Sequence, residues 1–437
     1  MNASPAVEFR EQPARPLAVQ QQPCRIALLG FGTVGRAVAT ILQSGSFPHL
    51  RLKLIYNRRV DRKRVPWVQP QVCWTDDIEQ VLASDADVVL ELAGGIEPAY
   101  SWVKGALLRG KSVVTANKKL IAAYGPELLE LARRQGCRLE FGAAVAGGVP
   151  VLCGVSPGLS GDRLLQLRGI LNGTCNYILH AMESRGVTLD VALREAQQRG
   201  YAEADPTDDV DGLDARAKLA ILVRTGFHLQ VDPEQIAAQT VLRVQPADFR
   251  YARELGYTIR QVARAELKAG TLLAEVGPAL VSANSPLGSA RNNQNVLVTT
   301  GQYGGETVFA GAGAGGAPTA VAVVSDLLAV AESRPAALSG PALVAVPVSN
   351  DFRCRHYVRV TPAQTSDAVA ALRRTVTGSG ISLRGLLHHP DPHDRRPSLA
   401  LVVEECSTQA LEKVLDEAHE AGVLAERPLR MPIVTSS

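Results

Sequence analysis

Six carboxylates fall within twelve residues near the middle of this chain, and a lysine follows them closely. A carboxylate and a lysine held together can take up and release a proton, which is the basis of general acid–base catalysis. The lysine, Lys218, leads directly into the apolar run 219–223, so the acidic stretch adjoins a buried segment. The acidic residues are Glu203, Asp205, Asp208, Asp209, Asp211 and Asp214.

The acidic stretch is expected to form a loop and the start of a helix. Pro206 and Gly212 interrupt regular structure, so a loop precedes a helix that begins near Leu213. Asp214 then lies in the first turn, where a carboxylate is favoured, and Lys218 lies four residues later on the same face. From this stretch alone, a solvated helix cap with an exposed ion pair is as good an interpretation as a catalytic pair.

A strand, a glycine-rich turn and a helical pattern follow one another near the N-terminus. The apolar segment 24–29 runs into Gly30, Gly32 and Gly35, which are spaced as Gly-x-Gly-x-x-Gly. Such glycines allow a tight turn and let the backbone approach a pyrophosphate, which then lies at the helix N-terminus. This order predicts a Rossmann-type nucleotide-binding domain.

The residues after the second predicted strand, 50–56, indicate which dinucleotide binds. A site that prefers NAD usually has an acid about 20 residues beyond the glycines, to hold the ribose 2′-hydroxyl. This chain has Arg58 and Arg59 there instead. A guanidinium group suits a 2′-phosphate, so we expect NADP, with NAD as the alternative cofactor. The competing interpretation is a solvated basic loop.

Two further predicted strands end in residues suited to ligand binding. Residues 87–93 lead into Gly94, and residues 112–116 lead into Lys118. Both ends should lie on the carboxyl edge of a parallel sheet, where ligands bind in such folds.

The pattern changes beyond residue 155. Strand-like segments at 164–171, 272–280 and 296–300 predict an α+β catalytic domain with an open mixed sheet. After it, a β-α-β-β-α order predicts a small ferredoxin-like domain, and the fold class is α/β. The expected divisions are a disordered tail (1–23), a nucleotide-binding domain (24–154), a catalytic domain (155–310), a helix that returns to the nucleotide-binding domain (311–334), a linker (335–349) and the small ferredoxin-like domain (350–437).

Composition excludes several classes of protein. The 437 residues are 46% hydrophobic and 20% charged with a net charge of +3, which favours a globular protein with a small-molecule substrate over a nucleic-acid partner. No apolar run approaches the roughly 20 residues that span a bilayer, so we expect no membrane partner. Seven scattered cysteines without a Cys-x-x-Cys pair favour reduced thiols and a cytoplasmic location.

Taken together, these motifs resemble homoserine dehydrogenase over essentially the whole chain beyond residue 23. The C-terminal part resembles the ACT domain that many bacterial members append, and without a preceding kinase domain we expect the monofunctional form. The motifs that carry the resemblance are residues 30–35, 91–95, 115–118, 143–150, 169–179 and 200–218.

The resemblance implies a reaction and a set of catalytic residues. The reaction is reversible hydride transfer between L-homoserine and L-aspartate 4-semialdehyde, in threonine, methionine and isoleucine biosynthesis, by a homodimer or homotetramer. Lys218 matches the acid–base lysine, Lys118 a second cation, and Asp214 the carboxylate beside the substrate hydroxyl. A lysine does such work only if its pKa is lowered, which partial burial and a second cation favour. The implied substrate-binding residues are Glu203, which pairs with the substrate ammonium, Asp208, Asp214 and Thr174.

The resemblance also implies where a cofactor and a monovalent cation such as sodium bind. In the family, backbone carbonyls largely hold the cation. Gly142 stands where the family usually has glutamate, so this chain keeps the backbone carbonyl at residue 142 and lacks the side-chain carboxylate. The implied cation-binding residues are Gly142, Val145, Gly147 and Val149. The cofactor-binding residues are Gly30, Phe31, Gly32, Thr33, Val34, Gly35, Arg58, Arg59, Gly94, Thr115, Lys118 and Gly315.

One turn of the ACT-like domain departs from the family. The first strand of an ACT domain is normally followed by a turn with a glycine, where an amino acid docks, but residues 361–370 contain none. A backbone amide that approaches a carboxylate tolerates little side-chain bulk, so we expect weak or absent inhibition by threonine.

Two other functions share parts of this pattern. An acylating aldehyde dehydrogenase would use Cys175 as its nucleophile, but its thiolate needs a base or cation, and His180 is poorly directed for this. A non-catalytic amino-acid sensor would use the nucleotide-binding and ACT-like folds for binding only. Turnover that depends on phosphate or coenzyme A would favour the first, and NADPH oxidation with the semialdehyde would exclude the second.

Overall fold

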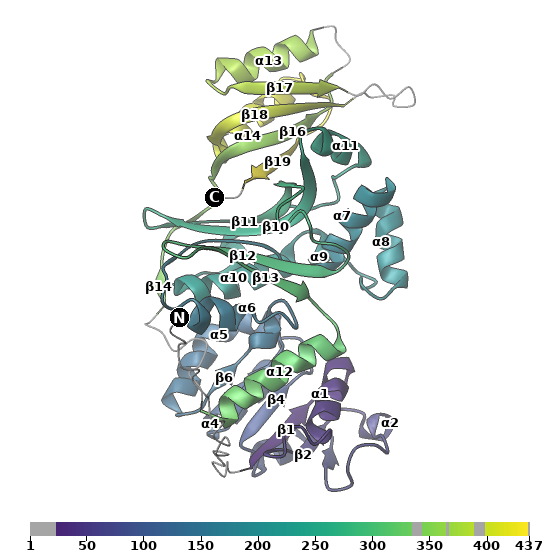
Figure 1. The fold of residues 1–437 in the computed structure, drawn as a ribbon, viewed down its shortest axis with the longest axis vertical. Helices are drawn as coiled ribbons and strands as arrows, with labels where there is room; N and C mark the ends of the chain where they lie inside the picture. Colours follow the sequence, from purple (N-terminus) through teal and green to yellow (C-terminus); the bar gives the residue numbers. More distant parts are fainter. Residues whose placement is uncertain (1–22, 334–342, 364–366, 389–397, 436–437) are drawn as a thin grey trace, which may run out of the picture.

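The chain folds into three parts stacked along one axis (Figure 1). The computed structural model describes residues 23–333, 343–363, 367–388 and 398–435. Almost all of the predicted tail and the first part of the predicted linker therefore lie outside the described residues, as does part of the departing turn of the ACT-like domain.

A six-stranded parallel sheet forms the N-terminal part, in the order β3-β2-β1-β4-β5-β6. This is the strand order of a dinucleotide-binding Rossmann fold, so that prediction is confirmed. The carboxyl ends of β1, β4 and β5 are neighbours at one edge, which brings the residues that follow them together. The strands are β1 Cys24–Leu29, β2 Leu50–Tyr56, β3 Cys73–Thr75, β4 Val88–Glu91, β5 Ser112–Thr115 and β6 Leu139–Glu140. The helices are α1 Thr33–Gln43, α2 Val60–Lys63, α3 Ile78–Ala83, α4 Ala99–Leu108 and α5 Lys118–Arg134.

Helix α12 (Gly316–Ala331) lies against α1, although almost three hundred residues separate them in the chain (Figure 1). Val323 and Leu327 of α12 share an apolar cluster with Val38 of α1. The chain therefore leaves the middle part of the molecule and packs back on the N-terminal part, which brings a second glycine-rich helix start beside the first.

A mixed sheet forms the middle of the molecule, where β7 lies antiparallel between β10 and β12. The sequence analysis missed β10 because Arg260, Gln261 and Arg264 are buried in it and interrupt its apolar pattern. The strands are β7 Leu164–Ile170, β8 Leu229–Gln230, β9 Ala237–Ala238, β10 Tyr257–Lys268, β11 Thr271–Ser282, β12 Gln294–Gly301 and β13 Gly305–Ala312. The helices are α6 Val151–Cys153, α7 Gly173–Arg185, α8 Leu189–Gln198, α9 Thr207–Val210, α10 Leu213–Phe227 and α11 Pro246–Glu254; short 3-10 and π turns are η1 Gly142–Ala144, η2 Gly154–Gly158 and η3 Pro233–Gln235.

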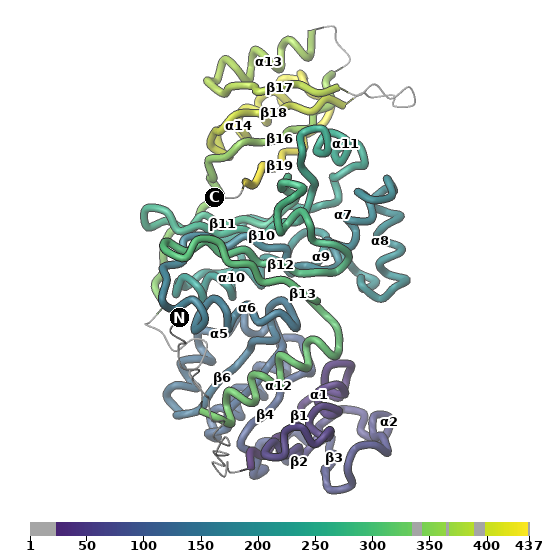
Figure 2. Tube along the Cα trace, viewed as in Figure 1, coloured from purple at the N-terminus to yellow at the C-terminus, as the bar shows by residue number. Residues whose placement is uncertain are grey.

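The C-terminal part continues the same sheet. Its strands lie in the order β19-β16-β18-β17, which with two helices gives the β-α-β-β-α-β arrangement of a ferredoxin-like domain. Strand β19 also pairs in parallel with β11, so the catalytic and C-terminal strands form one eleven-stranded sheet, and Figure 2 follows the chain through this junction. The elements are β14 Val344–Ala345, β15 Val348–Ser349, β16 Arg353–Val360, α13 Ala368–Gly378, β17 Leu383–His388, β18 Leu399–Ser407, α14 Thr408–Glu420 and β19 Leu429–Val434.

Candidate active site

Helix α10 carries two residues of the acidic stretch on one face. It begins at Leu213, as predicted, because Gly212 adopts a left-handed conformation (φ 77°) that turns the chain into the helix. Asp214 lies in the first turn and Lys218 one turn later. The loop before it is shorter than predicted, since residues 207–210 form the short helix α9.

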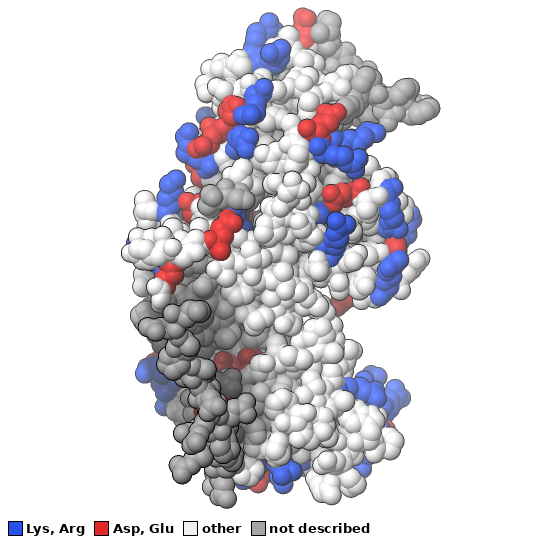
Figure 3. Space-filling view, viewed as in Figure 1, with Lys and Arg blue, Asp and Glu red and all other residues white. Residues whose placement is uncertain are grey.

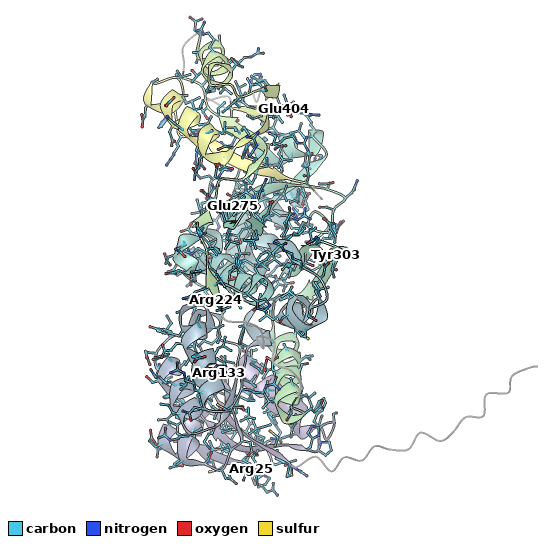
Figure 4. The ribbon with its side chains drawn as sticks, turned by 90° about the vertical axis from the view of Figure 1, so that its left-hand side faces the viewer. Arg25, Arg133, Arg224, Glu275, Tyr303 and Glu404 are labelled. Carbon is cyan, nitrogen blue, oxygen red and sulfur yellow. The ribbon has the colours of Figure 1, made fainter. Side chains whose placement is uncertain are left out.

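Helix α5 brings Lys118 to the same place from the nucleotide-binding part. Asn117 caps this helix by accepting a hydrogen bond from Leu120 N at 3.1 Å, and it donates one to Gly95 O at 2.6 Å. Arg224 joins α10 to α5, since its guanidinium donates to Ile121 O at 3.0 Å and lies at the level where the two parts meet (Figure 4). The two helices are therefore fixed with their first turns at one site.

A buried carboxylate lies between two lysines where these helices meet. Asp214 is only 5% exposed. Lys118 Nζ pairs with Asp214 Oδ1, and Lys218 Nζ lies 2.7 Å from Asp214 Oδ2. Lys218 Nζ also donates to Leu171 O at 2.7 Å. The solvated ion pair that the sequence left open is excluded, because Asp214 and Lys218 are both largely buried.

The charges in this cluster stabilise one another. Burial alone would raise the pKa of Asp214, but attraction by Lys218 and Lys118 lowers it well below its usual value. Burial also favours a lower pKa for Lys118, yet attraction by Asp214 is one of several contributions that raise it. Asp214 is therefore a fixed negative charge that holds two ammonium groups in place.

Asn172 links the acidic loop to this cluster, and the sequence analysis did not single it out. Its side-chain amide donates to Asp209 Oδ1 at 2.6 Å and to Asp214 Oδ2 at 2.8 Å. Its oxygen accepts from Cys175 N at 2.8 Å and caps α7, which begins at Gly173. An asparagine before a helix is a common cap, and that signal was available. No signal in the sequence indicated that Asn172 would bridge Asp209 and Asp214, which are distant from it in the chain.

Cys175 is not placed to act as a nucleophile. Its side chain is fully buried, and burial raises the pKa of its thiol well above the usual value. The thiol donates to Asp209 O at 3.1 Å, and Gln261 Nε2 lies 3.3 Å from the sulfur. A thiolate needs a nearby cation or base, whereas here the nearest charges are carboxylates, so the site does not support acylating chemistry.

The implied substrate-binding residues lie at the edge of the same site. Thr174 Oγ1 donates to Tyr201 O at 2.8 Å, which holds the loop that carries Glu203 against the first turn of α7. Glu203 is exposed. Asp208 is exposed and pairs with Lys119 Nζ at 2.7 Å, next to Lys118. The structure thus gathers α5, α7, α9 and α10 around one site, with the exposed Asp208 at its edge.

The three glycines after β1 adopt the geometry that their spacing predicts. Gly30 has φ +98°, and a Cβ there would lie 2.8 Å from the backbone of Leu92. A Cβ on Gly35 would lie 2.2 Å from Gly30 O, so α1 packs closely on β1. Gly32 precedes α1 and has open space around it, which leaves room for a pyrophosphate at the helix N-terminus.

A second helix start faces these glycines. Gly315, with φ +130°, precedes α12, and a Cβ on Gly316 would lie 2.9 Å from Thr33 Cγ2. Val34 lies next to Thr33 in the first turn of α1. Phe31 is fully buried against Trp74, so only its backbone can reach a cofactor.

A buried glutamate holds together two of the cofactor-binding positions that the resemblance implies. Glu91 accepts hydrogen bonds from Thr115 Oγ1 at 2.7 Å and from Gly94 N at 3.0 Å. It is fully buried at the end of β4. The Gly94 turn and the end of β5 are thereby held side by side at the carboxyl edge.

Arg58 and Arg59 are exposed at the end of β2, at the same edge of the sheet. The Arg58 guanidinium lies 6.0 Å from the centre of the Trp102 ring, which limits its orientations. Asn57 Oδ1 accepts from Arg59 N at 3.1 Å and fixes the turn. Both guanidinium groups are free to meet an anion from solvent.

The implied cation positions lie on the turn between β6 and α6. Gly142 N donates to Asp326 Oδ2 at 2.7 Å, and a Cβ on Gly142 would lie 2.6 Å from Asp326 Oδ1. Asp326 therefore fills the space that a glutamate at residue 142 would need. Burial, with nearby Glu140, raises the pKa of Asp326 to about 7. A Cβ on Gly147 would lie 2.6 Å from Gly313 O. Val145 and Val149 are buried on the same turn.

Within the described residues, neither a side-chain metal cluster nor a membrane-spanning helix is present. No group of three or more His, Cys, Asp or Glu side chains is placed to hold a metal ion, so a cation on the Gly142 turn would depend mainly on backbone carbonyls. In that same part of the chain, no helix is long and apolar enough to cross a membrane.

Comparisons with known proteins agree on one family. The family model for homoserine dehydrogenase matches residues 150–328, and the model for the NAD-binding domain of homoserine dehydrogenase matches residues 30–142. The chain is 34% identical to the homoserine dehydrogenase of Bacillus subtilis over 92% of this chain and 96% of that protein. It is 39% identical to that of Synechocystis over 83% of this chain and 88% of that protein. The crystal structure of a homoserine dehydrogenase from Thiobacillus denitrificans superposes with a TM-score of 0.88 at 30% identity, covering 95% of this chain and 99% of that one. A hyperthermophilic archaeal homoserine dehydrogenase in complex with NADPH superposes with a TM-score of 0.61 at 28% identity, covering 72% and 99%.

Proposed function

The chain belongs to the homoserine dehydrogenase family, and on this premise we propose roles for the residues where α5 meets α10. The protein is an oxidoreductase that acts on a CH–OH group and interconverts L-homoserine and L-aspartate 4-semialdehyde. The observation that carries the assignment of residues is the buried Asp214 carboxylate between two lysines. NADPH oxidation with L-aspartate 4-semialdehyde, followed by absorbance, tests the activity directly.

Lys218 is proposed as the acid–base group. An ammonium has three N–H groups, and Asp214 and Leu171 O engage two of them, so one direction is left for the substrate oxygen. In the reductive direction Lys218 donates its proton to the oxygen of the new hydroxyl, and in the oxidative direction it accepts that proton. Lys118 adds a second ammonium group beside the Asp214 carboxylate. The nicotinamide cofactor, when bound, supplies or accepts the hydride.

Glu203, Asp208 and Thr174 are proposed to bind the amino-acid end of the substrate. The exposed carboxylate of Glu203 would pair with the substrate ammonium, with Asp208 beside it. Thr174 supports this arrangement by holding the Glu203 loop to α7 through Tyr201. Asn172 is a positioning residue, since it sets Asp209 and Asp214 relative to each other.

NADP is the proposed cofactor, with NAD as the alternative, and the exposed guanidinium groups of Arg58 and Arg59 beyond β2 support this, because they suit a 2′-phosphate. Replacing both with glutamine is expected to weaken NADP binding about ten- to a hundredfold, which is the usual contribution of a charge-assisted hydrogen bond to affinity. NAD binding should change little. Fluorescence titration with NADPH and NADH measures both affinities, and Arg51→Gln, at the far end of β2, is the matched control. Equal weakening of both cofactors would contradict the assignment.

The Gly142 turn is proposed to hold a monovalent cation such as sodium. The backbone carbonyls of Gly142, Val145, Gly147 and Val149 would bind it, and the Asp326 carboxylate beside the turn suits a nearby positive charge. The cation would supply no acid–base chemistry. It would hold the turn that joins the nucleotide-binding part to α12.

A homodimer or homotetramer is the proposed assembly, and the free cysteines support the proposal of a cytoplasmic location. Strand β13 is an edge strand, and Val308 on it is 45% exposed, as is Val321 on α12 at 55%. Figure 3 shows few charged side chains over the part of the molecule where these elements lie. Val308→Glu is expected to shift the full chain toward monomer in sedimentation velocity, whereas Val191→Glu, on exposed α8, should not. A wild-type chain that sediments as a monomer would contradict this.

A further inference from the structure

A buried asparagine lies on β12, beside the site described above. Asn295 is 1% exposed, and the next three residues of the strand are buried and apolar. Asparagine is disfavoured inside strands, and a buried amide destabilises the fold unless its donors and its acceptor find partners. The contacts of the Asn295 side chain therefore indicate what an amide contributes at this position.

The amide nitrogen of Asn295 shares its acceptor with the proposed acid–base lysine. Asn295 Nδ2 donates to Leu171 O at 3.1 Å, and Lys218 Nζ donates to the same oxygen at 2.7 Å. A carbonyl oxygen has two lone pairs, so these two donors complete its hydrogen bonding. Leu171 follows β7, which pairs with β12 as far as Ile170 opposite Val296. Asn295 thus fixes the direction in which Leu171 O faces Lys218.

The oxygen of the same amide has no donor. Asn295 Oδ1 is buried and has no hydrogen-bond partner among the described residues. Exchanging the two ends of the amide would not provide one, because Oδ1 would then face the carbonyl oxygen of Leu171, which cannot donate. An unpartnered buried oxygen destabilises the folded state, whereas a leucine has nearly the same shape and lacks that oxygen. Stability therefore does not explain the amide.

A glycine-rich segment packs on the amide from another side. A Cβ on Gly313 would lie 2.1 Å from Asn295 Oδ1 and 2.2 Å from Asn295 Cγ. Only glycine leaves room for such a close approach. Two residues later, Gly315 precedes α12 and is one of the cofactor-binding positions that the resemblance implies. The amide is held between this segment and Leu171 O, so it has little freedom to turn.

We propose that Asn295 is a positioning residue, whose amide holds Leu171 O so that Lys218 keeps one N–H directed at the substrate oxygen. The inference rests on the proposed acid–base role of Lys218. Asp214 and Leu171 O engage two of the three N–H groups of this ammonium. If Leu171 O moves, the third N–H changes direction, and a misplacement of about 1 Å can lower turnover about a hundredfold. Asn295 acts on the reaction through Leu171 O.

Replacing Asn295 with leucine tests the proposal in steady-state reduction of the semialdehyde. The change removes the donor to Leu171 O, so kcat should fall about tenfold or more. It also removes the unpartnered oxygen, so the melting temperature should stay at or above that of the wild type. The KM for NADPH should stay within about twofold, because leucine still fills the space against Gly313. A kcat within threefold of the wild type, or a loss of kcat matched by an equal loss of folded protein, would overturn the proposal.

Asn176 provides a matched control. It is fully buried, its amide donates to a backbone carbonyl, Asn292 O, at 3.0 Å, and its Oδ1 likewise has no partner in the part of the chain that the structure describes. This carbonyl is not the one that Lys218 contacts. Asn176→Leu should therefore leave kcat within about twofold of the wild type. A fall as large as that of Asn295→Leu would show a general effect of losing a buried amide, and would overturn the specific role of Asn295.

A double-mutant cycle separates this inference from the proposed function. If Asn295 acts through Lys218, then Asn295→Leu should change the kcat of the Lys218→Ala variant by less than about twofold. Equal losses in the wild type and in Lys218→Ala would overturn the inference and leave the role of Lys218 intact. A Lys218→Ala variant that keeps a third or more of its activity would instead overturn the acid–base role, and the inference with it.

Discussion

Replacing Lys218 with alanine is expected to lower kcat by about two to four powers of ten, the usual contribution of a general acid–base group. The reason is geometric, because Lys218 Nζ lies between Asp214 and Leu171 O with one N–H direction left over. The affinity for NADPH should stay near that of the wild type, since no cofactor position depends on this side chain. Stopped-flow reduction of the semialdehyde and fluorescence titration of NADPH measure the two quantities.

The control for this variant is Arg216→Ala, on the same helix. Arg216 pairs with Glu234, away from Asp214, so its loss should leave turnover within about twofold. Added methylamine should restore part of the activity of Lys218→Ala, because it can carry the missing amino group into the space left. Activity of a third or more of the wild type in Lys218→Ala would remove this residue from the mechanism.

Replacing Asp214 with asparagine is expected to lower both stability and turnover. The change removes the one negative charge between Lys118 and Lys218, which leaves two ammonium groups facing each other. The cost is about 3 kcal/mol, at the low end for a broken buried pair because Lys118 is 35% exposed. Turnover should fall about a hundredfold or more, since Lys218 loses the partner that orients it. Urea unfolding and steady-state kinetics measure these effects.

The pH dependence of the free energy of unfolding is a second test of the Asp214→Asn variant. The pKa of Asp214 is lowered in the folded state, so its stabilising contribution is present above its unfolded pKa of 3.8 and is lost as the pH falls below it. Asp214→Asn should therefore lose less stability than the wild type between about pH 5 and pH 3. Asp208→Asn, which alters an exposed pair, should follow the wild type. Parallel curves for wild type and Asp214→Asn would show that the carboxylate is not stabilised by its lysines.

Local patterns in the sequence predicted the elements that carry the site. Strand β2 has the predicted bounds, and α10 begins at the predicted residue, directly after the left-handed Gly212. Strand β10 was missed because its buried arginines are satisfied by partners on other segments, such as Glu275 for Arg264.

Contacts between distant segments could not be read from local patterns. The pairing of Lys118 with Asp214 depends on how α5 packs on α10, and only the family resemblance pointed to it. Asn172 was overlooked because its role exists only once β7 ends beside α9 and α10.

The pairing of β19 with β11 makes the last strand of the chain part of the catalytic sheet. Leu280 of β11 shares an apolar cluster with Tyr357, Met431 and Ile433 of the C-terminal domain. The domain is therefore not a detachable module, and the two parts should melt as one unit. A chain that ended at residue 349 would leave part of β11 with an open edge beside newly exposed apolar side chains, which is a template for aggregation. Any change in the C-terminal domain during evolution thus had to preserve the frame that holds the active site.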